Sequence, residues 1–411
     1  MELRDYQKRL SSEAKSLLDK YKFVLLSMEV RTGKTFTALA TIEKYWAKNV
    51  LFLTKKKAIS SISDDYEYFK DKFNMTIINY ESLHKVEWDF DLIVLDECHQ
   101  LWTYPKPNNK YKDIKKRFLK TPKILLSGTI SPESYSQLYH QFAVHWLFKD
   151  YKNFYKWAKD FVTVRQVRTS YWISNDYSNA NRAKVIECIK PVLITFTQKE
   201  AWFSTEIKEI IEHVEMKSDT YEISTRLIRD KVVEIWDEVI LADTMVKEQQ
   251  KVHQLFSWTI KFESWNTMIV DDSKAKYIKE RFKWKKIWIF YNFKAERDML
   301  KQTFWNDICE DLETFNSTDK NIMLQIVSGR EWISLRAADN LVFFNIAFSA
   351  LSYRQARDRL TTMDRKENTI YRIFAKWWLE DKIYKSVMNK KSFTSKLYEE
   401  DIKWSQGTRK N

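Results

Sequence analysis

The stretch of sequence that decides the fold is Phe23-Val24-Leu25-Leu26-Ser27-Met28-Glu29-Val30-Arg31-Thr32-Gly33-Lys34-Thr35. An apolar run leads directly into Gly33, Lys34 and Thr35, which is typical of a buried strand followed by a phosphate-binding loop. Such a loop directs backbone N–H groups at phosphate oxygens, the lysine adds positive charge, and the threonine hydroxyl can hold magnesium. The pattern G-x-x-x-x-G-K-[ST] would place glycine at Met28, so the match is partial. We therefore predict nucleoside-triphosphate binding, with a chance tripeptide as the alternative.

The composition bounds the class of protein. The chain has 411 residues, of which 44% are hydrophobic, and this length suggests roughly two to three domains with cores of their own. Its 70 Lys and Arg residues exceed its 56 Asp and Glu residues, which gives a net charge of +14. The excess is spread along the chain and favours a polyanionic partner such as nucleic acid over an acidic protein or a neutral metabolite. The alternative is that the charge serves solubility alone.

Cysteine usage and hydropathy predict an intracellular protein. Cys98, Cys188 and Cys309 show neither metal-ligand spacing nor a disulfide framework, so we expect a reducing environment and no zinc site. The N-terminus carries charges without an apolar core behind them, and no uncharged run approaches ~18 residues. We therefore expect no signal peptide, no membrane span and a cytoplasmic location.

Glycine is scarce and tryptophan abundant in this chain. The sequence contains four Gly and 17 Trp residues, whereas an ordinary Gly content of about 7% would give roughly 29. Residues such as Trp46, Trp102 and Trp332 stand at expected helix ends or loops, where Gly normally supplies a positive φ. We hypothesise that many Trp positions are UGA codons that the source genome reads as Gly. The alternative is an aromatic-rich protein that stacks Trp on bases, and the codons at these positions and at Trp378 would decide.

The first part of the chain alternates short apolar runs with charged, helix-like stretches. This βαβ pattern predicts a parallel sheet covered by helices, with ligands at the carboxyl ends of the strands. The expected strands are residues 23–28, 50–53, 76–79, 92–96 and 124–127.

The rest of the chain predicts an insertion and a second α/β domain. In the middle we expect a helical region with helices at 205–213 and 226–241 and one strand at 192–196. The βα rhythm then returns, with strands at 286–291, 323–327, 341–345 and 369–374 and helices at 275–282 and 294–304. The predicted domains are residues 1–145, the helical insertion 146–240, residues 241–378, and a basic helix and tail at 379–411.

Two further clusters of polar residues follow predicted strands. Asp96 and Glu97 end the apolar run 91–95, which places two carboxylates at a strand tip near the phosphate loop. Asp96 can hold magnesium and Glu97 can accept a proton from an attacking water; the alternative is a helix N-cap. Ser127 and Thr129 end the next strand, where their hydroxyls could link the nucleotide site to the other domain.

These clusters resemble, in order and spacing, the successive motifs of superfamily 2 helicases and translocases, which include the DEAD/DEAH-box proteins. Leu3–Gln7 resembles the upstream motif in which the glutamine reads adenine. Ser328–Leu335 resembles motif V with Trp332 in a Gly position, and Tyr353–Arg359 resembles motif VI. The form of motif VI points to the chromatin-remodeller-like branch and its phage-encoded members. The resemblance spans nearly the whole chain and implies two RecA-like parallel-sheet domains with a helical insertion between them.

The resemblance also implies roles for individual residues. The expected catalytic residues are Lys34 at the phosphates, Glu97 as the base and Arg359 as an arginine that reaches the nucleotide from the second domain. The expected nucleotide contacts are Arg4, Tyr6, Gln7, Arg31, Thr32, Gly33, Lys34, Thr35, Gly329 and Glu331, and the expected magnesium ligands are Thr35 and Asp96. The residues expected to couple the nucleotide site to the second domain are Ser127, Thr129 and Gln355.

Other residues resemble the strand-contacting motifs of the family. Such residues grip phosphates and so bind nucleic acid without sequence preference, whereas the alternative for the lysine run is a solvated surface. Two positions depart from the family pattern: Arg31 replaces a common Gly, and Thr362 replaces the second motif VI Arg, for which Arg357 or Arg365 could substitute. The expected nucleic-acid contacts are Thr54, Lys55, Lys56, Asn79, Tyr80 and Ser334.

The function that the resemblance implies is an ATP- and Mg²⁺-dependent helicase or translocase that moves along or remodels nucleic acid, DNA in preference to RNA. The alternative is a helicase-fold nucleic-acid-binding protein with weak or no ATPase activity. We expect a monomer with no membrane partner and no zinc, in the cytoplasm of a bacterial host if a phage encodes it.

Overall fold

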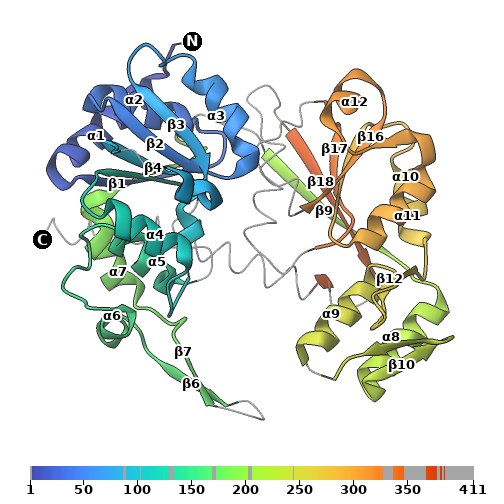
Figure 1. The fold of residues 1–411 in the computed structure, drawn as a ribbon. Helices are drawn as coiled ribbons and strands as arrows, with labels where there is room; N and C mark the ends of the chain where they lie inside the picture. Colours follow the sequence, from blue (N-terminus) through green and yellow to red (C-terminus); the bar gives the residue numbers. More distant parts are fainter. Residues whose placement is uncertain are drawn as a thin grey trace, which may run out of the picture. The chain divides into compact units, whose positions relative to one another are not determined.

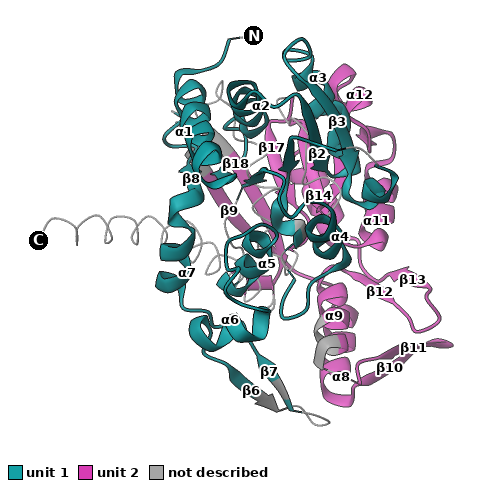
Figure 2. Ribbon diagram, turned by 60° about the vertical axis from the view of Figure 1, so that its left-hand side comes forward, with its two compact units in different colours: residues 1–202, 390–411 teal, residues 203–389 magenta. Residues whose placement is uncertain are grey.

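The computed structural model places the described residues in two compact units, one up to Ala201 and one from Glu206 onward (Figure 1, Figure 2). Each unit has its own six-stranded sheet and its own hydrophobic core. The prediction of an α/β fold with two parallel-sheet domains is confirmed. The described residues are 2–86, 89–101, 103–128, 134–168, 173–201, 206–243, 245–326, 337–346, 367–376, 380–381 and 384.

The sheet of the first unit has the strand order β3-β2-β4-β5-β1-β8, and all neighbouring strands run parallel. Their carboxyl ends therefore lie along one edge. β1 lies between β5 and β8 and is buried over its whole length, as expected for a strand that helices cover on both faces. The six strands are β1 (Phe23–Met28), β2 (Asn49–Thr54), β3 (Asn74–Asn79), β4 (Leu92–Leu95), β5 (Lys123–Ser127) and β8 (Leu193–Phe196).

Helices and one hairpin complete the first unit. Hairpin β6–β7 is antiparallel and extends from the unit in Figure 1. The α-helices are α1 (Asp5–Tyr21), α2 (Lys34–Tyr45), α3 (Ile59–Tyr66), α4 (Asn109–Phe118), α5 (Leu138–Ala143), α6 (Phe154–Phe161) and α7 (Arg182–Ile189), and the hairpin strands are β6 (Arg165–Arg168) and β7 (Ile173–Asp176). The short 3-10 helices are η1 (Lys56–Ala58), η2 (Tyr80–Lys85), η3 (Cys98–Leu101), η4 (Tyr135–Gln137) and η5 (Lys190–Val192).

The sheet of the second unit has the order β15-β16-β14-β17-β18-β9 and is also parallel throughout. Two antiparallel hairpins, β10–β11 and β12–β13, lie outside it. The strands are β9 (Glu206–Val214), β10 (Val232–Ile235), β11 (Glu238–Leu241), β12 (Thr259–Lys261), β13 (Thr267–Ile269), β14 (Ile287–Tyr291), β15 (Ile308–Cys309), β16 (Asn321–Gln325), β17 (Asn340–Phe343) and β18 (Glu367–Ala375). The helices are α8 (Ser218–Asp230), α9 (Met245–Phe256), α10 (Ser273–Arg281), α11 (Lys294–Phe304), η6 (Trp305–Asp307) and α12 (Leu312–Ser317).

The nine strands expected from the βα rhythm are all present, but two expected helices are wrong. In the range expected as the helix 205–213, the chain instead forms the edge strand β9 (Glu206–Val214), which pairs with β18 along its whole length. Glu and Lys favoured a helix there, yet the β-branched residues between them suit a pleated surface, and nonlocal pairing decides the outcome. Residues 226–241 change from α8 to the hairpin β10–β11 after Asp230, because the Val- and Ile-rich runs pair with each other.

The segment expected as one helical insertion, residues 146–240, is divided between the units. Helices α6 and α7 and strand β8 belong to the first unit, where β8 pairs with β1. Strand β9, helix α8 and hairpin β10–β11 belong to the second unit. The strands at 193–196 and 206–214 account for this division, because each supplies the edge of a different sheet.

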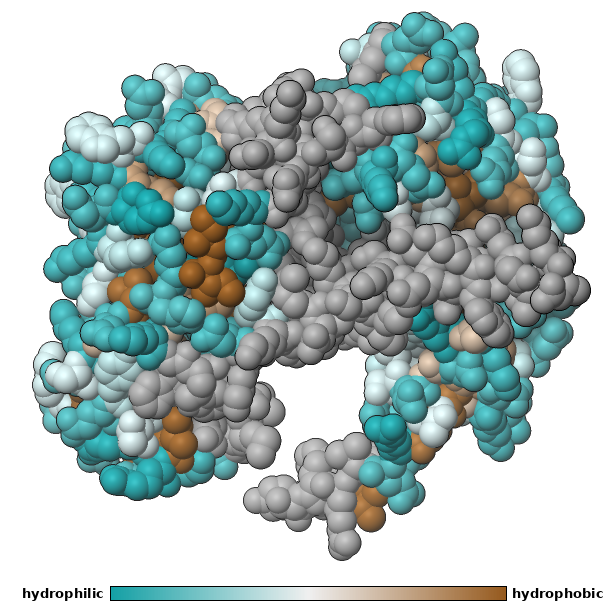
Figure 3. Space-filling model, turned by 180° about the vertical axis from the view of Figure 1, so that it is seen from behind, coloured by the Kyte–Doolittle hydropathy of each residue, from teal (hydrophilic) through white to brown (hydrophobic). Residues whose placement is uncertain are grey.

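The visible surface of the described residues is mainly hydrophilic, with apolar patches that are small and separated (Figure 3). No helix in the described ranges is long and apolar enough to cross a membrane.

A buried histidine makes the stability of the first unit depend on pH. His140 is buried on α5, its Nδ1 lies 2.5 Å from the carbonyl oxygen of Thr103, and burial lowers its pKa to about 4. Between the ordinary pKa of about 6.5 and about 4, the unfolded chain binds a proton that the native state excludes. Protonation of His140 therefore costs no stability above pH 6.5. As the pH drops to about 4, it lowers the free energy of unfolding by up to about 3 kcal/mol.

We expect His140→Phe to flatten the fall in stability between about pH 7 and about pH 5, because phenylalanine cannot take up a proton. Urea unfolding of both proteins at the two pH values measures the difference. The matched control is His84→Phe at an exposed position on η2. Equal pH dependence in wild type and His140→Phe would contradict the assignment.

Candidate functional site

The phosphate loop connects the carboxyl end of β1 to the first turn of α2. Its turn is closed by Thr32, which is fully buried and whose Oγ1 donates a hydrogen bond to the Glu29 carbonyl oxygen at 2.7 Å. Gly33 is the N-cap of α2 with φ 76° and ψ 40°, a left-handed conformation that glycine adopts without strain. The free N–H groups of the first helical turn and the helix dipole therefore open toward this loop, as an anion site requires.

Side chains at the start of α1 hold the loop from outside. Tyr6 donates its hydroxyl hydrogen to the Thr32 carbonyl oxygen at 3.1 Å, and Gln7 donates from Nε2 to the Gly33 carbonyl oxygen at 3.4 Å. A Cβ atom on Gly33 would lie 2.3 Å from Gln7 Nε2, so a side chain at this position would displace the amide of Gln7 from the loop. Arg4 Nη1 in turn donates to the Tyr6 hydroxyl at 3.3 Å. The structure thus brings Arg4, Tyr6 and Gln7 together with the loop.

The segment after β8 also supports the loop, a role that the sequence alone does not predict. Gln198 donates from its backbone N–H to Glu29 Oε2 at 2.7 Å and from Nε2 to the Val30 carbonyl oxygen at 2.8 Å. The ring of Phe196 stacks on Tyr6 with a centroid distance of 4.6 Å. The sequence predicts a strand at 192–196 and places a polar residue after it. It does not predict which strand lies beside this one in the sheet, because that depends on the tertiary fold.

The acidic pair lies at the end of β4, beside the loop. Lys34 Nζ lies 3.5 Å from Glu97 Oε1, and both side chains are nearly buried. A Cβ atom on Gly128, just after β5, would lie 3.6 Å from Lys34 Nζ, so the end of β5 meets the same lysine. The carboxyl ends of β1, β4 and β5 therefore lie close together, at the edge of the sheet where α/β proteins bind ligands.

Burial and charge give the two carboxyl groups different proton affinities. Burial and the neighbouring charge of Glu97 raise the pKa of Asp96 to about 7. Burial also opposes ionisation of Glu97, but Lys34 and His99 outweigh it and hold the pKa of Glu97 well below its usual range. His99 Nδ1 lies 3.0 Å from Glu97 Oε2. Glu97 also has a φ of 48°, and strained backbone of this kind collects at functional sites.

The donor set around Asp96 suits a divalent cation. Its carboxyl group is buried and accepts a hydrogen bond from Thr54 Oγ1 at 2.7 Å. Asp96 and Glu97 together carry two potential negative charges, and the ammonium of Lys34 and the ring of His99 both face Glu97. Oxygen ligands and uncompensated negative charge are what Mg²⁺ prefers. Asp96, together with the hydroxyl of Thr35 in the first turn of α2, therefore fits a magnesium site in its chemistry.

The residues expected to contact nucleic acid differ in exposure. The side chains of Thr54 and Tyr80 are buried, and the Tyr80 hydroxyl donates to the Asp96 carbonyl oxygen at 2.7 Å. These two side chains support the acidic strand end in this structure instead of facing solvent. Lys56 is exposed after β2, and Asn79 ends β3 with its Nδ2 hydrogen-bonded to Glu81. Lys55 is half-buried next to Lys56.

Part of the predicted site lies outside the described residues. Ser127 is described and is buried at the end of β5. The undescribed members are Thr129, Gly329, Glu331, Ser334, Gln355 and Arg359, together with Arg357, Thr362 and Arg365.

We expect Thr54→Val to weaken the site without unfolding the protein. The change removes the hydroxyl that orients the Asp96 carboxyl group, and losing a hydrogen-bond partner of a metal ligand typically costs about 10–100-fold in activity or metal affinity. The measurement is ATP hydrolysis over a range of Mg²⁺ concentrations. The control is Thr220→Val, a buried threonine of the second unit whose Oγ1 has no hydrogen-bond partner within the described residues. Equal losses in both variants would contradict the role of Thr54.

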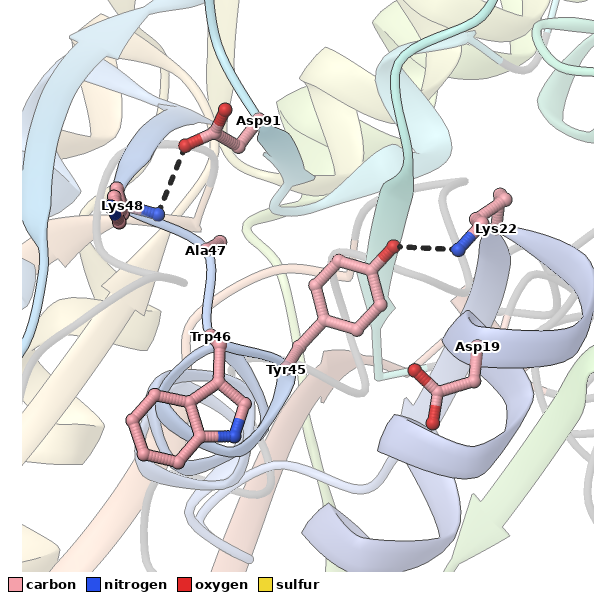
Figure 4. Close-up of a pocket in the computed structure, with 7 residues that line it drawn as sticks. All are labelled: Asp19, Lys22, Tyr45, Trp46, Ala47, Lys48 and Asp91. Atoms are coloured by element: carbon pink, nitrogen blue, oxygen red, sulfur yellow. Dashed lines mark hydrogen bonds between the residues drawn. The ribbon is translucent and has the colours of Figure 1, made fainter.

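A hollow in the first unit lies at the opposite edge of the sheet from this site (Figure 4). Asp91 directly precedes β4 and Lys48 precedes β2, so the hollow is at the amino ends of these strands. Lys22 Nζ donates to the Tyr45 hydroxyl at 3.3 Å on one side, and Lys48 N donates to Asp91 Oδ2 at 3.0 Å on the other. Parallel sheets bind ligands at the carboxyl ends of their strands, so this hollow is separate from the candidate site.

Comparisons with known proteins found one family model and similar solved structures. Residues 1–72 match the family model described as "Type III restriction enzyme, res subunit". Among solved structures, the Sulfolobus solfataricus SWI2/SNF2 ATPase core domain is similar at 13% sequence identity, covering 95% of this chain and 89% of that chain, with a TM-score of 0.42. No curated protein sequence is similar to this chain. The family match covers α1, the phosphate loop and β2.

Proposed function

We propose that this chain binds ATP with Mg²⁺ at the phosphate loop and hydrolyses it to move along or remodel nucleic acid, as a helicase or translocase. The observation that carries the proposal is the approach of Lys34 Nζ to Glu97 Oε1 at 3.5 Å, beside the buried Asp96. This combination of a phosphate-binding lysine, a magnesium ligand and a base is what phosphoryl transfer to water requires.

The loop residues bind and orient the nucleotide. The N–H groups at the start of α2 donate hydrogen bonds to the phosphate oxygens, and Lys34 supplies charge to the β- and γ-phosphates. Gln7 reads the adenine, and its contact with the Gly33 carbonyl oxygen couples that recognition to the shape of the loop. Thr35 and Asp96 would hold Mg²⁺, which offsets the negative charge of the phosphates when it is bound.

The ion pair between Lys34 and Glu97 suggests how nucleotide binding prepares the base. With Lys34 at 3.5 Å, the carboxylate of Glu97 has a low pKa and is a weak base. ATP phosphates compete for the same ammonium, so binding frees Glu97 and raises its proton affinity. Glu97 then takes a proton from the water that attacks the γ-phosphorus, the bond to the β–γ bridging oxygen breaks, and ADP and phosphate leave.

The second unit and the nucleic-acid contacts complete the proposal. Arg359 would reach the nucleotide, and Ser127, Thr129 and Gln355 would couple its state to the grip on nucleic acid. Lys55 and Lys56 would contact phosphates of the strand, because lysines after a sheet edge bind backbone charge without sequence preference. We propose DNA in preference to RNA as the substrate, a monomeric protein and a cytoplasmic location. A phage origin stays a prediction, which the neighbouring genes would test.

The deciding experiment measures phosphate release from ATP without nucleic acid and with single-stranded DNA, duplex DNA and single-stranded RNA. Stimulation by nucleic acid is expected, with weaker stimulation at higher salt because phosphate contacts release counterions. Strand displacement and triplex displacement assays then separate unwinding from translocation. Absence of hydrolysis with every substrate, despite bound ATP, would contradict the proposal.

The second candidate is a helicase-fold protein that binds nucleic acid and hydrolyses little ATP. It is favoured by Arg31, which has a φ of 65° within the phosphate loop, where the family commonly has glycine. A bulky residue in a left-handed conformation strains a loop that must fit closely around phosphates. The same hydrolysis assay distinguishes the two candidates, since the second predicts nucleic-acid binding without turnover.

A further inference from the structure

Positive backbone φ angles are concentrated on tryptophan. In the part of the chain that the structure describes, ten residues other than glycine have a positive φ, and five of them are Trp. Bulky aromatic residues avoid this region because Cβ crowds the backbone, and Asn, Asp and Gly are its usual occupants. The five residues are Trp46, Trp236, Trp258, Trp265 and Trp305.

Two of these residues end helices. Trp46 is the C-cap of α2 with φ 61° and ψ 28°, and its N–H donates to the Glu43 carbonyl oxygen at 3.2 Å. This left-handed helix end is the position that glycine most often occupies. Trp305 follows α11 with φ 51° and ψ −117°, the mirror image of the extended conformation. Only glycine enters that mirror region without steric cost. Their side chains are 86% and 75% exposed, so burial does not compensate the strain.

Two others form hairpin turns. β10 and β11 pair up to Ile235 and Glu238, which leaves a two-residue loop whose first residue, Trp236, has φ 55°. Turns of this length need a positive φ at that position and favour glycine or asparagine. In the β12–β13 hairpin, Trp265 has φ 75°, and its N–H donates to the Phe262 carbonyl oxygen at 3.1 Å. A type I turn followed by a left-handed residue of this kind takes glycine. Both indoles are more than three-quarters exposed, at 88% and 78%.

The fifth residue lies inside the second unit. Trp258 has φ 62°, and its N–H donates to the Leu255 carbonyl oxygen at 2.8 Å, just after the end of α9. The backbone here again turns through a left-handed residue into β12. This is the same helix-end geometry as at Trp46.

Other tryptophans behave as ordinary core residues. Trp157 on α6 is buried and stacks on Phe161 at a centroid distance of 4.9 Å. Trp146 donates from Nε1 to the Tyr21 carbonyl oxygen at 2.6 Å and stacks on the Tyr21 ring. Neither has a positive φ. Among the described residues, a positive φ therefore sets one group of Trp apart, which a uniform enrichment in aromatic residues does not explain.

We propose that Trp46, Trp236, Trp258, Trp265 and Trp305 are glycine in the protein that its own cell makes, because their codons are UGA read as glycine. Trp146 and Trp157 are tryptophan encoded by UGG. The alternative, that these Trp side chains stack on nucleic-acid bases, explains why indoles are exposed. It does not explain why the backbone at these residues has a positive φ. The five residues share a backbone conformation, and they belong to five different helix ends and turns in two units.

The proposal changes the hollow in Figure 4. Trp46 is one of its seven lining residues, and its indole stands at the end of α2. Glycine at that position would contribute no side chain to the lining of the hollow. The other six lining residues would remain around a hollow that is more open on that side.

The codons and the native protein give the first test. We expect UGA at all five positions and UGG at Trp146 and Trp157, and peptides from the protein purified from its own cells should have the mass of glycine at the five. UGG codons at the five positions, or peptides that contain Trp there, would overturn the proposal.

Stability of the full chain gives the second test. Trp46→Gly, Trp236→Gly, Trp265→Gly and Trp305→Gly each relieve a strained residue without removing a packed side chain, and we expect each to raise Tm by about 2–4 °C. The matched control is Trp157→Gly, which removes a stacked core ring in the same unit as Trp46 and should lower Tm. A fall in Tm for the variant that combines all four changes would overturn the proposal, and a rise would support it.

Discussion

Lys34→Ala should lower nucleic-acid-stimulated ATP hydrolysis by about 10²–10³-fold or more, as removal of one preorganised electrostatic group does in other active sites. The ammonium is nearly buried at the start of α2 and faces the Glu97 carboxylate at 3.5 Å. Alanine leaves the phosphates without that charge, and it leaves Glu97 without its main counterion. ATP binding should therefore weaken together with turnover.

The measurement is phosphate release at saturating DNA, combined with the affinity for a fluorescent ATP analogue. Lys44→Ala is the matched control, because Lys44 lies on the same helix but donates to the Lys8 carbonyl oxygen on α1, away from the loop. That variant should keep its hydrolysis rate. Substantial DNA-stimulated hydrolysis by Lys34→Ala would show that the loop is not the catalytic nucleotide site.

Glu97→Gln should reduce kcat by about 10²–10⁴-fold, the usual contribution of a general base. Glutamine keeps the size of the side chain but cannot accept the proton of the attacking water. Removal of the carboxylate also frees Lys34 from its ion pair, so ATP affinity should be retained or increased. The separation of binding from turnover distinguishes this variant from Lys34→Ala, in which both fall.

The control for this change is Glu43→Gln on α2, at the far end of the helix from the loop. Single-turnover hydrolysis and equilibrium binding of ATP, each with and without DNA, give the two quantities. A loss of ATP binding equal to the loss of kcat would indicate a structural role for Glu97 and would count against its role as base.

Much of the first unit could be predicted because its signals are local. The apolar run before Gly33 and the run before Asp96 are each short enough to be strands, and each ends in polar residues at the carboxyl edge. The close approach of Lys34 to Glu97 follows from this arrangement, since parallel strands bring their carboxyl ends to one edge.

The two wrong helices have different causes, one a distant strand partner and the other a turn without a turn residue. Strand β9 was mistaken for a helix because its Glu and Lys residues suit either structure, and only pairing with β18 decides between them. The hairpin β10–β11 was missed because Trp236 occupies the turn, and tryptophan gives no turn signal. Glycine at that position would have marked the hairpin.

The sequence by itself determined that the chain is α/β with two parallel sheets, that a phosphate loop follows the first strand, and that an acidic pair ends a neighbouring strand. Periodicity and turn chemistry act within a few residues, so they can be read without the fold. Tertiary structure alone decided that β8 lies beside β1, so that Phe196 and Gln198 support the loop. It also decided that Thr54 and Tyr80 turn inward to Asp96. These contacts join residues separated by 16 to 190 positions, and such contacts form only when sheet packing brings the segments together.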